Sequence, residues 1–327
     1  MGARSPVAAD LSVAAEVAAM RAKAQSGDAH AQFRLGRFMI LGHIPVASVD
    51  EPMRWINAAC AQRYPLAMLF QATLAALGVA RAQSYDDAIK FVADAAATGD
   101  ERANGQLATL GGARGFDPSY WLNPPPAQQH FAAPRMFTIE QFLSREVCAW
   151  HVLQAGERLQ TAPVKDPASG KAAFSNWRTN SGCGFSSIEA DLVLQMTNLR
   201  IAAALGLPVS HQEPSNILHY SIGQEYRPHY DFVREEEEQA FTGELQRVGQ
   251  RLATCLIYLN SDFSGGETEF PQLNWSYKGG TGNALIFWNI SERGERERSS
   301  YHAGRPVTAG EKWIFSKWVR AKPHPLK

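Results

Sequence analysis

Two histidines and an aspartate have the residue types and the spacing of metal ligands. His229 and Asp231 are separated by one residue, and His302 follows 71 residues after Asp231. Alternate residues of a β-strand point to the same side, so His229 and Asp231 can reach one metal ion together. A histidine from another strand would complete the two imidazoles and one carboxylate that non-haem Fe(II) oxygenases use. Because the His-x-Asp motif is short, an ordinary surface pair is the alternative.

A lysine close to the second histidine adds a possible anion site. Lys312 follows His302 by ten residues and begins the segment KWIFSKWVR. A lysine that points into the interior of a barrel is unfavourable unless an anion pairs with it. The C5 carboxylate of 2-oxoglutarate would be such an anion, whereas a solvent-exposed lysine at a strand end is the alternative. We therefore expect Lys312 to bind a carboxylate of this kind.

The segments around these residues are typical of short antiparallel strands. Between residues 216 and 320 the chain has about eight stretches that are rich in β-branched and aromatic residues and are separated by glycine-containing turns. A short strand and a helix are expected at 137–159, and a second helix at 189–208. This order indicates an α+β domain built on an antiparallel barrel or a double-stranded β-helix, the jelly roll, flanked by helices.

Several motifs in this part of the chain carry a resemblance to a known family. They appear in the family's order and span essentially all of residues 136–327: RTNSG (178–182), NILHYSIGQEYRPHYD (216–231), QRLATCLIYLN (250–260), GGETEFP (265–271), GNALIFWN (282–289) and HAGRPVTAGEKW (302–313). The region resembles the prolyl 4-hydroxylase family of 2-oxoglutarate- and Fe(II)-dependent dioxygenases. Arg305 stands where the family commonly has cysteine, a departure that affects no candidate ligand.

The resemblance implies a role for each matching residue. It makes His229, Asp231 and His302 the iron ligands and Lys312 the partner of the distal carboxylate of 2-oxoglutarate. It also implies two residues that hydrogen-bond the same cosubstrate, Tyr220 and Thr268, and three residues that line a peptide groove, Tyr226, Arg251 and Trp318. The alternatives are that Tyr226 and Trp318 are aromatic core residues and that Arg251 pairs with a neighbouring acid on the surface.

The resemblance also implies the reaction and its cofactors. Fe(II), 2-oxoglutarate and O2, with ascorbate as an additional reductant, would serve to hydroxylate prolyl residues of a peptide or protein, releasing succinate and CO2. The metal centre carries this chemistry, so we name no catalytic residue beyond it. One alternative is the same chemistry on a free amino acid or small metabolite, which a closed pocket rather than an open groove would favour. Another is a repeat-based scaffold whose barrel is catalytically silent.

The first 115 residues have a different pattern. They are rich in Ala and Leu, and Ala31, Ala67 and Ala103 recur at a spacing of 36 residues. The AxxxLGxxxxxG pattern at 31–42, with a looser copy at 67–78, resembles Sel1-like repeats, which are related to the tetratricopeptide repeat. The resemblance implies an N-terminal α-solenoid that recognises a peptide or protein partner. The alternative is a helical bundle that supports the second domain.

A proline-rich segment separates the two parts. Residues 116–135 contain five prolines, a density that interrupts helices and favours an extended chain. We therefore expect a helical-repeat domain at 1–115, a linker at 116–135 and a dioxygenase domain at 136–327.

Two charged segments lie next to the metal-ligand motifs. Residues 234–249 carry four consecutive glutamates, and residues 291–300 alternate charges directly before His302. We expect solvated flexible loops at both places. As an alternative they would close over the substrate, and the acidic run would then favour a basic peptide.

The composition limits the classes of partner and the cellular compartment that we expect for this protein. Of the 327 residues, 45% are hydrophobic and 20% are charged, and 32 basic side chains balance 32 acidic ones. We expect neither nucleic acid nor a membrane as a partner, because the chain has no excess charge and no apolar run of about 18 residues. Acidic residues at positions 10 and 16 do not fit a signal peptide, and the four cysteines have no CxxC spacing. These features favour a cytoplasmic protein with buried thiols. The oligomeric state is left open.

Overall fold

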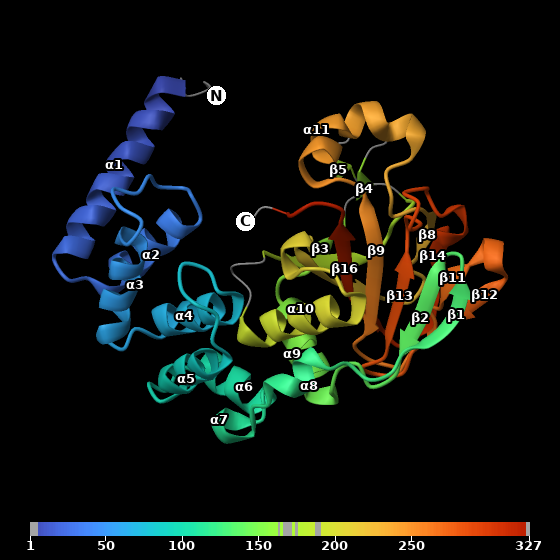
Figure 1. The fold of residues 1–327 in the computed structure, drawn as a ribbon, viewed down its shortest axis with the longest axis horizontal. Coiled ribbons are helices and arrows are strands. Elements are labelled where there is room, and N and C mark those ends of the chain that lie inside the picture. Colours follow the sequence, from blue (N-terminus) through green and yellow to red (C-terminus); the bar gives the residue numbers. More distant parts are fainter. Residues whose placement is uncertain (1–5, 163, 166–171, 174–175, 187–190, 325–327) are drawn as a thin grey trace. The chain divides into compact units, whose positions relative to one another are not determined.

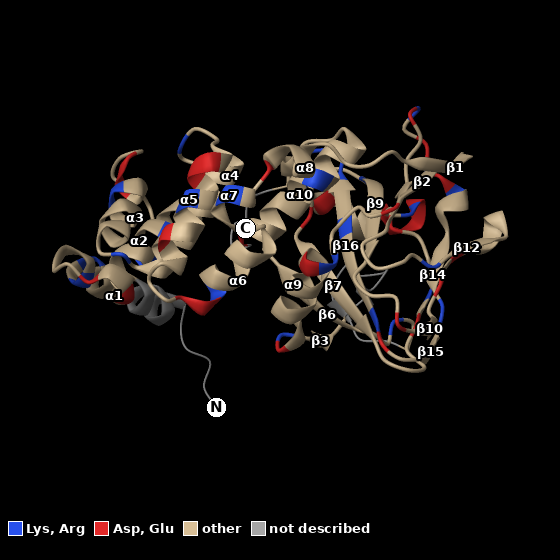
Figure 2. Ribbon diagram, turned by 90° about the horizontal axis from the view of Figure 1, so that it is seen from below, with Lys and Arg blue, Asp and Glu red and all other residues tan. Residues whose placement is uncertain are grey.

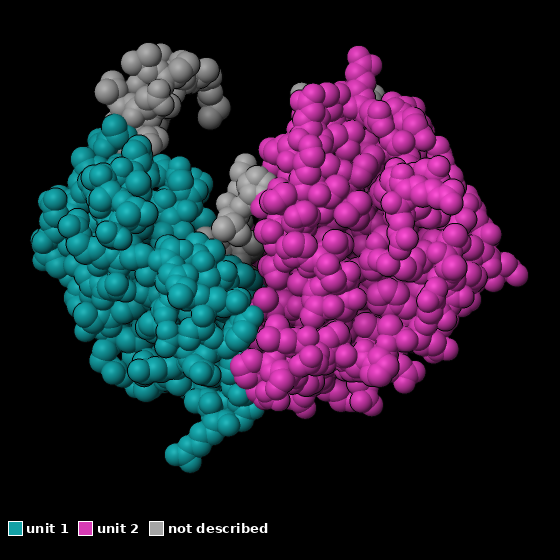
Figure 3. Space-filling view, viewed as in Figure 1, with its two compact units in different colours: residues 1–116, 188–195, 327 teal, residues 117–187, 196–326 magenta. Residues whose placement is uncertain are grey.

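The chain forms two compact units, which Figure 3 colours separately. The computed structural model describes residues 6–162, 164–165, 172–173, 176–186 and 191–324. Unit 1 comprises residues 1–116, 188–195 and 327, and unit 2 comprises residues 117–187 and 196–326. The ends of the two expected domains, residues 1–5 and 325–327, lie outside the described residues. Basic and acidic residues are interspersed along both units (Figure 2).

Unit 1 is helical. Its helices are α1 (Pro6–Gln25), α2 (Ala29–Ile40), α3 (Glu51–Ala61), α4 (Pro65–Leu77), α5 (Tyr85–Ala96), α6 (Glu101–Thr109) and the short α7 (Gly112–Gly115). Helices α2 and α6 begin in the same way, because the Asp28 and Asp100 side chains accept hydrogen bonds from the backbone N–H groups three residues later, at 2.6 and 2.7 Å. No described helix of the chain is long and apolar enough to cross a membrane.

Small residues let the helices of unit 1 approach closely. The three alanines that recur at 36-residue spacing are 4% exposed or less: Ala31, Ala67 and Ala103. A Cβ atom on Gly36 would lie 2.7 Å from the carbonyl oxygen of Pro52, so helix α2 meets helix α3 without room for a side chain at this point. Leu35 fills the adjacent core and is fully buried.

The proline-rich segment departs from the extended linker that its composition predicts. It contains helix α8 (Pro118–Leu122) and strand β1 (Gln128–Ala132), and both belong to unit 2. Asp117 caps α8 by accepting the Ser119 N–H, and Pro118 stands at the first helical position, where a missing N–H costs nothing. Tertiary packing then fixes the segment, because the Trp121 side chain of α8 is 3% exposed.

Unit 2 is built on two antiparallel sheets (Figure 1). The large sheet has the order β1-β2-β13-β9-β16-β7-β6-β3, with β2 (Arg135–Ile139), β13 (Ala284–Trp288), β9 (Arg251–Tyr258), β16 (Lys312–Arg320), β7 (Ser215–Tyr220), β6 (Ser181–Phe185) and β3 (Gln160–Thr161). The small sheet has the order β12-β11-β14-β8, with β12 (Trp275–Tyr277), β11 (Thr268–Phe270), β14 (His302–Gly304) and β8 (Tyr226–His229). Two short pairs complete the set: β10 (Ser264–Gly265) with β15 (Val307–Ala309), and β4 (Val164–Lys165) with β5 (Ala172–Ala173).

The two sheets pack face to face, as the jelly-roll prediction requires. Phe270 of the small sheet contacts Phe287 of the large sheet edge-to-face, with the ring centroids 5.1 Å apart, and both side chains are fully buried. Helices α9 (Arg145–Gly156) and α10 (Leu192–Leu205) lie on the other side of the large sheet (Figure 1), where His151 of α9 packs on Phe315 of β16. All eight strand segments expected between residues 216 and 320 form strands.

The charged segment after Asp231 is ordered rather than a flexible loop. Residues 235–248 form a 3₁₀ turn (η2, Glu235–Glu237) and helix α11 (Glu238–Val248). The glutamates pair with arginines of the second charged segment: Arg298 contacts the Glu235 carboxylate at 2.7 and 2.8 Å, and Arg296 contacts Glu238. The acidic run is therefore partly neutralised within the chain, which weakens its predicted preference for a basic peptide.

Candidate active site

The register of two neighbouring strands brings the three candidate ligands together. β8 and β14 pair antiparallel with His229 directly opposite His302, and Asp231 follows two residues after His229. One ligand atom from each of the three residues lies within 4.8 Å of the other two. The Nε2 atoms of His229 and His302 are each 3.7 Å from an oxygen of the Asp231 carboxylate.

Backbone carbonyls orient both imidazoles. The Nδ1 atom of His229 is 2.8 Å from the Arg227 carbonyl oxygen, and that of His302 is 2.9 Å from the Ser300 carbonyl oxygen. A carbonyl only accepts, so each Nδ1 carries a proton, and each Nε2 faces the Asp231 carboxylate. Burial, together with the neighbouring His302, lowers the pKa of His229 to about 3. His229 is therefore neutral near pH 7, as a metal ligand must be.

The carboxylate of Asp231 is buried and ionised. Burial alone would raise its pKa, but His302, His229 and Arg251 and a hydrogen bond from Thr254 outweigh burial, so that the pKa is lowered. Thr254 donates through Oγ1 to Oδ2 of Asp231 at 2.6 Å. Two imidazole nitrogens and one carboxylate are a donor set that suits Fe(II); both histidines lie on paired strands of the small sheet, and Asp231 follows β8 by two residues.

Aromatic rings support the ligands from both sides. The Tyr226 ring stacks on the His229 imidazole, with the centroids 3.5 Å apart and the planes 18° from parallel. Phe270 and Phe287 pack on the His302 imidazole at 5.6 and 4.8 Å between centroids. This packing keeps both imidazole planes in the orientation that the hydrogen bonds set.

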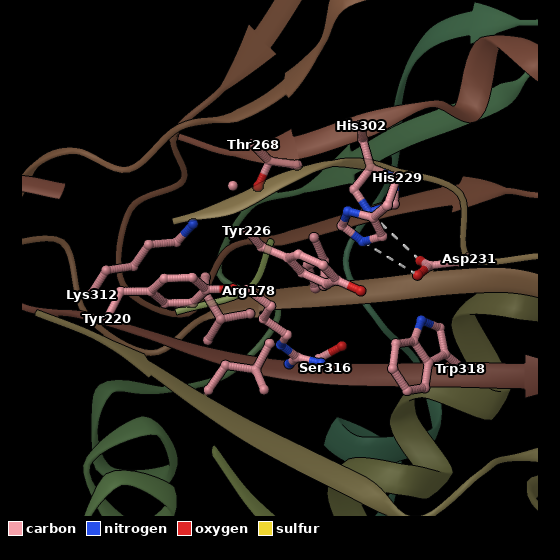
Figure 4. A pocket seen from close by; sticks show the side chains of 14 residues that line it. Arg178, Tyr220, Tyr226, His229, Asp231, Thr268, His302, Lys312, Ser316 and Trp318 are labelled. Atoms are coloured by element: carbon pink, nitrogen blue, oxygen red, sulfur yellow. Dashed lines mark ion pairs between the residues drawn. The ribbon is translucent and has the colours of Figure 1, made fainter. Parts of the chain in front are cut away.

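One pocket extends from the ligands to Lys312 (Figure 4). Residues of both sheets line it: Arg178, Leu218, Tyr220, Tyr226, His229, Asp231, Leu256, Thr268, His302, Gly304, Lys312, Ile314, Ser316 and Trp318. Figure 4 shows Lys312 and Tyr220 at one end, and His229, His302 and Asp231 at the other. The pocket therefore joins a metal-binding end to a cationic end.

Lys312 is buried without a counter-charge in contact with it. Its side chain is 2% exposed, and among the described residues no hydrogen-bond or ion-pair partner contacts its Nζ atom. Its Nζ atom lies 4.9 and 5.6 Å from the ring centroids of Tyr220 and Tyr258, and the Glu267 carboxylate acts on it electrostatically from beyond contact distance. Burial lowers the pKa of Lys312 to about 7. A carboxylate bound beside it would supply the missing partner.

Two hydroxyl groups complete this end. Burial raises the pKa of Tyr220 to about 12, so its phenol stays protonated and can donate a hydrogen bond. Thr268 lies across the pocket, and its Oγ1 is 2.9 Å from the hydroxyl of Tyr258, which donates to the Tyr277 carbonyl oxygen at 2.8 Å. The Lys312 ammonium and the Tyr220 hydroxyl are donors that fit the distal carboxylate of 2-oxoglutarate, whereas the Thr268 hydroxyl donates its hydrogen to Tyr258, because the Tyr258 hydrogen goes to the Tyr277 carbonyl.

The structure separates the three residues expected in the peptide groove. Tyr226 and Trp318 line the pocket, whereas Arg251 is not among its lining residues. The Arg251 guanidinium makes two hydrogen bonds to the Glu213 carboxylate, at 2.7 and 3.1 Å, and lies 3.7 Å from the centroid of the Trp318 ring. Arg251 thus has an acidic partner in the interior rather than at the surface.

Sequence reasoning assigned no role to Arg178, which lines the pocket. Its guanidinium lies 4.6 Å from the centroid of the Tyr226 ring, and its Nε donates to Asn180 at 2.8 Å. The backbone of Arg178 pairs with Tyr226 of β8 through an isolated bridge outside the named strands, so its segment has no strand pattern. The RTNSG motif that contains it was the available signal.

Known proteins share the part of the chain that holds this pocket. The 2OG-Fe(II) oxygenase superfamily pattern matches residues 215–320, which include the three candidate ligands and Lys312. The chain is 35% identical over 204 residues to prolyl 4-hydroxylase 1 of Arabidopsis thaliana, covering 58% of this chain and 70% of that protein. It is 34% identical over 206 residues to prolyl 4-hydroxylase subunit alpha-1 of Gallus gallus, covering 63% of this chain but only 39% of the chicken subunit.

A solved structure is also similar. The viral collagen prolyl hydroxylase of Paramecium Bursaria Chlorella virus-1 is 26% identical, with a TM-score of 0.45, and the match covers 57% of this chain and 96% of the viral one. The sequence match with the Arabidopsis enzyme extends over more than two thirds of that protein. The chain therefore belongs to the prolyl 4-hydroxylase family of 2OG-Fe(II) oxygenases, and the predicted family is confirmed.

Proposed function

We propose that this chain is an Fe(II)- and 2-oxoglutarate-dependent dioxygenase that hydroxylates prolyl residues of a peptide or protein. The observation that carries the proposal is the pocket with two imidazoles and a carboxylate at one end and, at the other, the buried Lys312, which has no counter-charge in contact with it among the described residues. In the overall reaction, one oxygen atom of O2 enters the prolyl C–H bond. The other enters succinate as 2-oxoglutarate loses CO2.

The residues of the pocket would divide the work between them. His229, Asp231 and His302 would hold Fe(II), which with bound 2-oxoglutarate supplies the oxidising chemistry. Lys312 would pair with the distal carboxylate of 2-oxoglutarate, and the Tyr220 hydroxyl would donate a hydrogen bond to it. The Thr268 hydroxyl would do the same only by turning away from Tyr258, to which it donates in this structure. Apolar pocket walls from Leu218, Leu256 and Ile314 exclude water from the space between the two ends. No side chain is required as a general base.

Two aromatic residues are the proposed contacts of the peptide. Tyr226 and Trp318 line the pocket at its metal end (Figure 4), where a target C–H bond would have to approach. Arg251 would act on the peptide through Trp318, because its guanidinium covers one face of that ring. The names of the relatives support a prolyl target.

For unit 1 we propose a short α-solenoid of Sel1-like repeats that recognises a peptide or protein partner. The recurring Asp caps of α2 and α6 and the buried alanines at 36-residue spacing support this assignment. We also propose a cytoplasmic location, supported by four cysteines that are all free thiols.

Succinate release tests the proposed function. Purified protein is incubated with Fe(II), 2-oxoglutarate, ascorbate and air, with and without a proline-rich peptide, and Asp231→Ala is the matched control. Peptide-stimulated succinate release, together with a gain of one oxygen atom on the peptide, supports the proposal. Succinate release that ignores the peptide would favour a small-molecule substrate. The absence of both iron binding and turnover would favour a silent scaffold.

A further inference from the structure

A buried chain of side-chain hydrogen bonds leads to the carboxylate of Asp231. Asn289, at the end of β13, donates through Nδ2 to Oγ1 of Thr254 at 2.9 Å, and Thr254 donates to Oδ2 of Asp231 at 2.6 Å. Asn289 is fully buried, Thr254 is 1% exposed and Asp231 is 5% exposed. Thr254 is not among the pocket-lining residues, so it would reach bound substrate only through Asp231.

The chemistry of the three groups fixes the direction of this chain. An ionised carboxylate only accepts hydrogen bonds, so the Thr254 hydroxyl must donate its single hydrogen to Asp231. The Thr254 oxygen then accepts the amide hydrogen of Asn289. Among the described residues Thr254 is the side-chain donor to Oδ2, and no hydrogen-bond donor contacts Oδ1 of the same carboxylate. The two carboxylate oxygens are therefore unequal before any metal binds.

The backbone of Asn289, the first residue of this hydrogen-bonded series, is held by the segment that leads to His302. The backbone carbonyl oxygen of Asn289 accepts a hydrogen bond from the backbone N–H of Glu297 at 2.9 Å. The backbone N–H of Asn289 donates to the backbone carbonyl oxygen of Leu252 at 2.7 Å. Glu297 in turn lies in the segment that runs directly into His302. Asn289 thus joins strand β9, strand β13 and the approach to His302 at one buried point.

We propose that Thr254 and Asn289 are positioning residues for the metal centre. Thr254 holds the Asp231 carboxylate in one rotational state and withdraws charge from Oδ2, which leaves Oδ1 as the stronger ligand atom. Asn289 acts through Thr254 by fixing the direction of its hydroxyl. This inference rests on the proposed Fe(II) site, and it assigns two residues outside the ligand set to that site.

Metal affinity tests the inference independently of turnover. Fe(II) is titrated anaerobically into wild type and variants by calorimetry, and the visible spectrum of the Co(II)-substituted protein reports the ligand field. Loss of an outer-shell partner typically weakens metal binding by roughly 10- to 100-fold, and we expect Thr254→Val to fall in that range and to change the Co(II) spectrum. Thr254→Ser retains the hydroxyl and should bind Fe(II) within about threefold of wild type.

A matched variant controls for the loss of a buried threonine hydroxyl. Thr197 is also fully buried in unit 2, but its hydroxyl contacts His151 at 3.0 Å instead of a candidate ligand. Thr197→Val should leave Fe(II) affinity unchanged. Asn289→Ala gives a second variant that retains the Thr254 hydroxyl. Asn289→Ala alone should weaken Fe(II) binding. The double variant Thr254→Val/Asn289→Ala should bind Fe(II) as weakly as Thr254→Val alone, because Asn289 acts through Thr254.

The outcomes separate the inference from the proposed function. If wild type binds Fe(II) and folded Thr254→Val binds it equally well, the inference is overturned while the proposed function stands. Equal losses in Thr254→Val and Thr197→Val would also overturn it, since they would indicate a general effect on the fold. If wild type binds neither Fe(II) nor Co(II), the proposed function fails and the inference fails with it.

Discussion

Two lysines of strand β16 have the same burial and different surroundings. Lys312 and Lys317 are 2% and 1% exposed, and burial lowers the pKa of each to about 7. They are five residues apart, so they point to opposite sides of the large sheet. Lys317 donates to the Glu213 carbonyl oxygen at 2.9 Å and to Ser215 Oγ at 2.5 Å. In the described part of the chain Lys312 has no hydrogen-bond partner, and its Nζ atom lies near the rings of Tyr220 and Tyr258.

The difference distinguishes a structural lysine from a binding lysine. A buried ammonium is unfavourable unless its hydrogen-bonding capacity is met, and the fold meets it for Lys317. Lys312 faces the pocket instead, and its unmet capacity is available to a ligand carboxylate. Residue type and burial alone would not separate the two, whereas their hydrogen-bond partners do.

The largest expected effect is the loss of 2-oxoglutarate binding on replacing Lys312. Removing one partner of a buried charge pair typically costs about 2–5 kcal/mol, so Lys312→Met should raise the KM for 2-oxoglutarate at least about 30-fold. The unliganded protein should be as stable as wild type or more stable, because an unpaired buried ammonium is gone. Steady-state kinetics and urea unfolding measure the two effects. A KM like that of wild type would remove Lys312 from the site.

Lys317→Met should show the reverse pattern. It leaves the Glu213 carbonyl and the Ser215 hydroxyl without their donor, and an unmet buried polar group costs about 1–3 kcal/mol. We expect the free energy of unfolding to fall by about that amount and the KM for 2-oxoglutarate to change little. If Lys317→Met raised this KM as much as Lys312→Met, the contrast between the two lysines would be wrong.

The affinity for 2-oxoglutarate should fall as the pH rises above about 7. Burial puts the pKa of Lys312 at about 7 in the ligand-free protein, so above that pH the carboxylate must bind together with a proton. The affinity then falls by up to about tenfold per pH unit, which is about 1.4 kcal/mol. Titrations of the metal-loaded protein with 2-oxoglutarate at pH 6.5 to 8.5 (roughly spanning that pKa) test this. Lys312→Met should lose the dependence, whereas Lys317→Met should keep it.

The free energy of unfolding should rise with pH, whereas the affinity for 2-oxoglutarate should fall. Both lysines have a folded-state pKa below the unfolded value, so between about 7 and about 10.4 the unfolded chain binds more protons than the folded one. The free energy of unfolding of the ligand-free protein therefore rises with pH over that window. Each lysine-to-methionine variant should flatten the rise, as urea midpoints at several pH values would show.

The smallest effect is expected where charges are paired in contact with water. The pair between Arg298 and Glu235 is about half exposed on both sides, and exposed ion pairs contribute little. Arg298→Ala should therefore change neither the urea midpoint nor the KM for 2-oxoglutarate appreciably. A large loss of stability in this variant would indicate that ion pairing on the surface, and not only in the interior, fixes the fold.

The sequence predicts the features of unit 2 that follow from local pattern. Short runs rich in β-branched and aromatic residues between glycine-containing turns predict strands such as β9 and β16, and the motif spacing identifies the candidate ligands. Two-residue strands such as β3 and β10 are too short to give a pattern. The sequence predicts a loop where helix α11 forms. The glutamate at the start of this helix, Glu238, pairs with Arg296, which lies 58 residues further along the chain. Long-range contacts of this kind are not visible in local sequence.

The same limit applies to charged residues of the site. The pairing of Arg251 with Glu213 joins residues 38 positions apart. The sequence leaves open whether Arg251 lines the groove or pairs with an acid, and it does not identify that acid. Lys317 received no prediction, because only the fold shows that it is buried and partnered. Lys312 is predicted to bind an anion from its place ten residues after His302 in an expected barrel strand, and the resemblance implies the same role. Burial and partners therefore had to come from the structure.

Succinate formation by wild type and His229→Ala, measured side by side, tests the central claim most directly. Both proteins receive Fe(II), 2-oxoglutarate, air and a proline-rich peptide, and circular dichroism confirms that both are folded. We predict succinate release in step with peptide hydroxylation by wild type, and none by His229→Ala. Equal turnover by the two proteins, or no turnover by iron-loaded wild type, would contradict the proposed site.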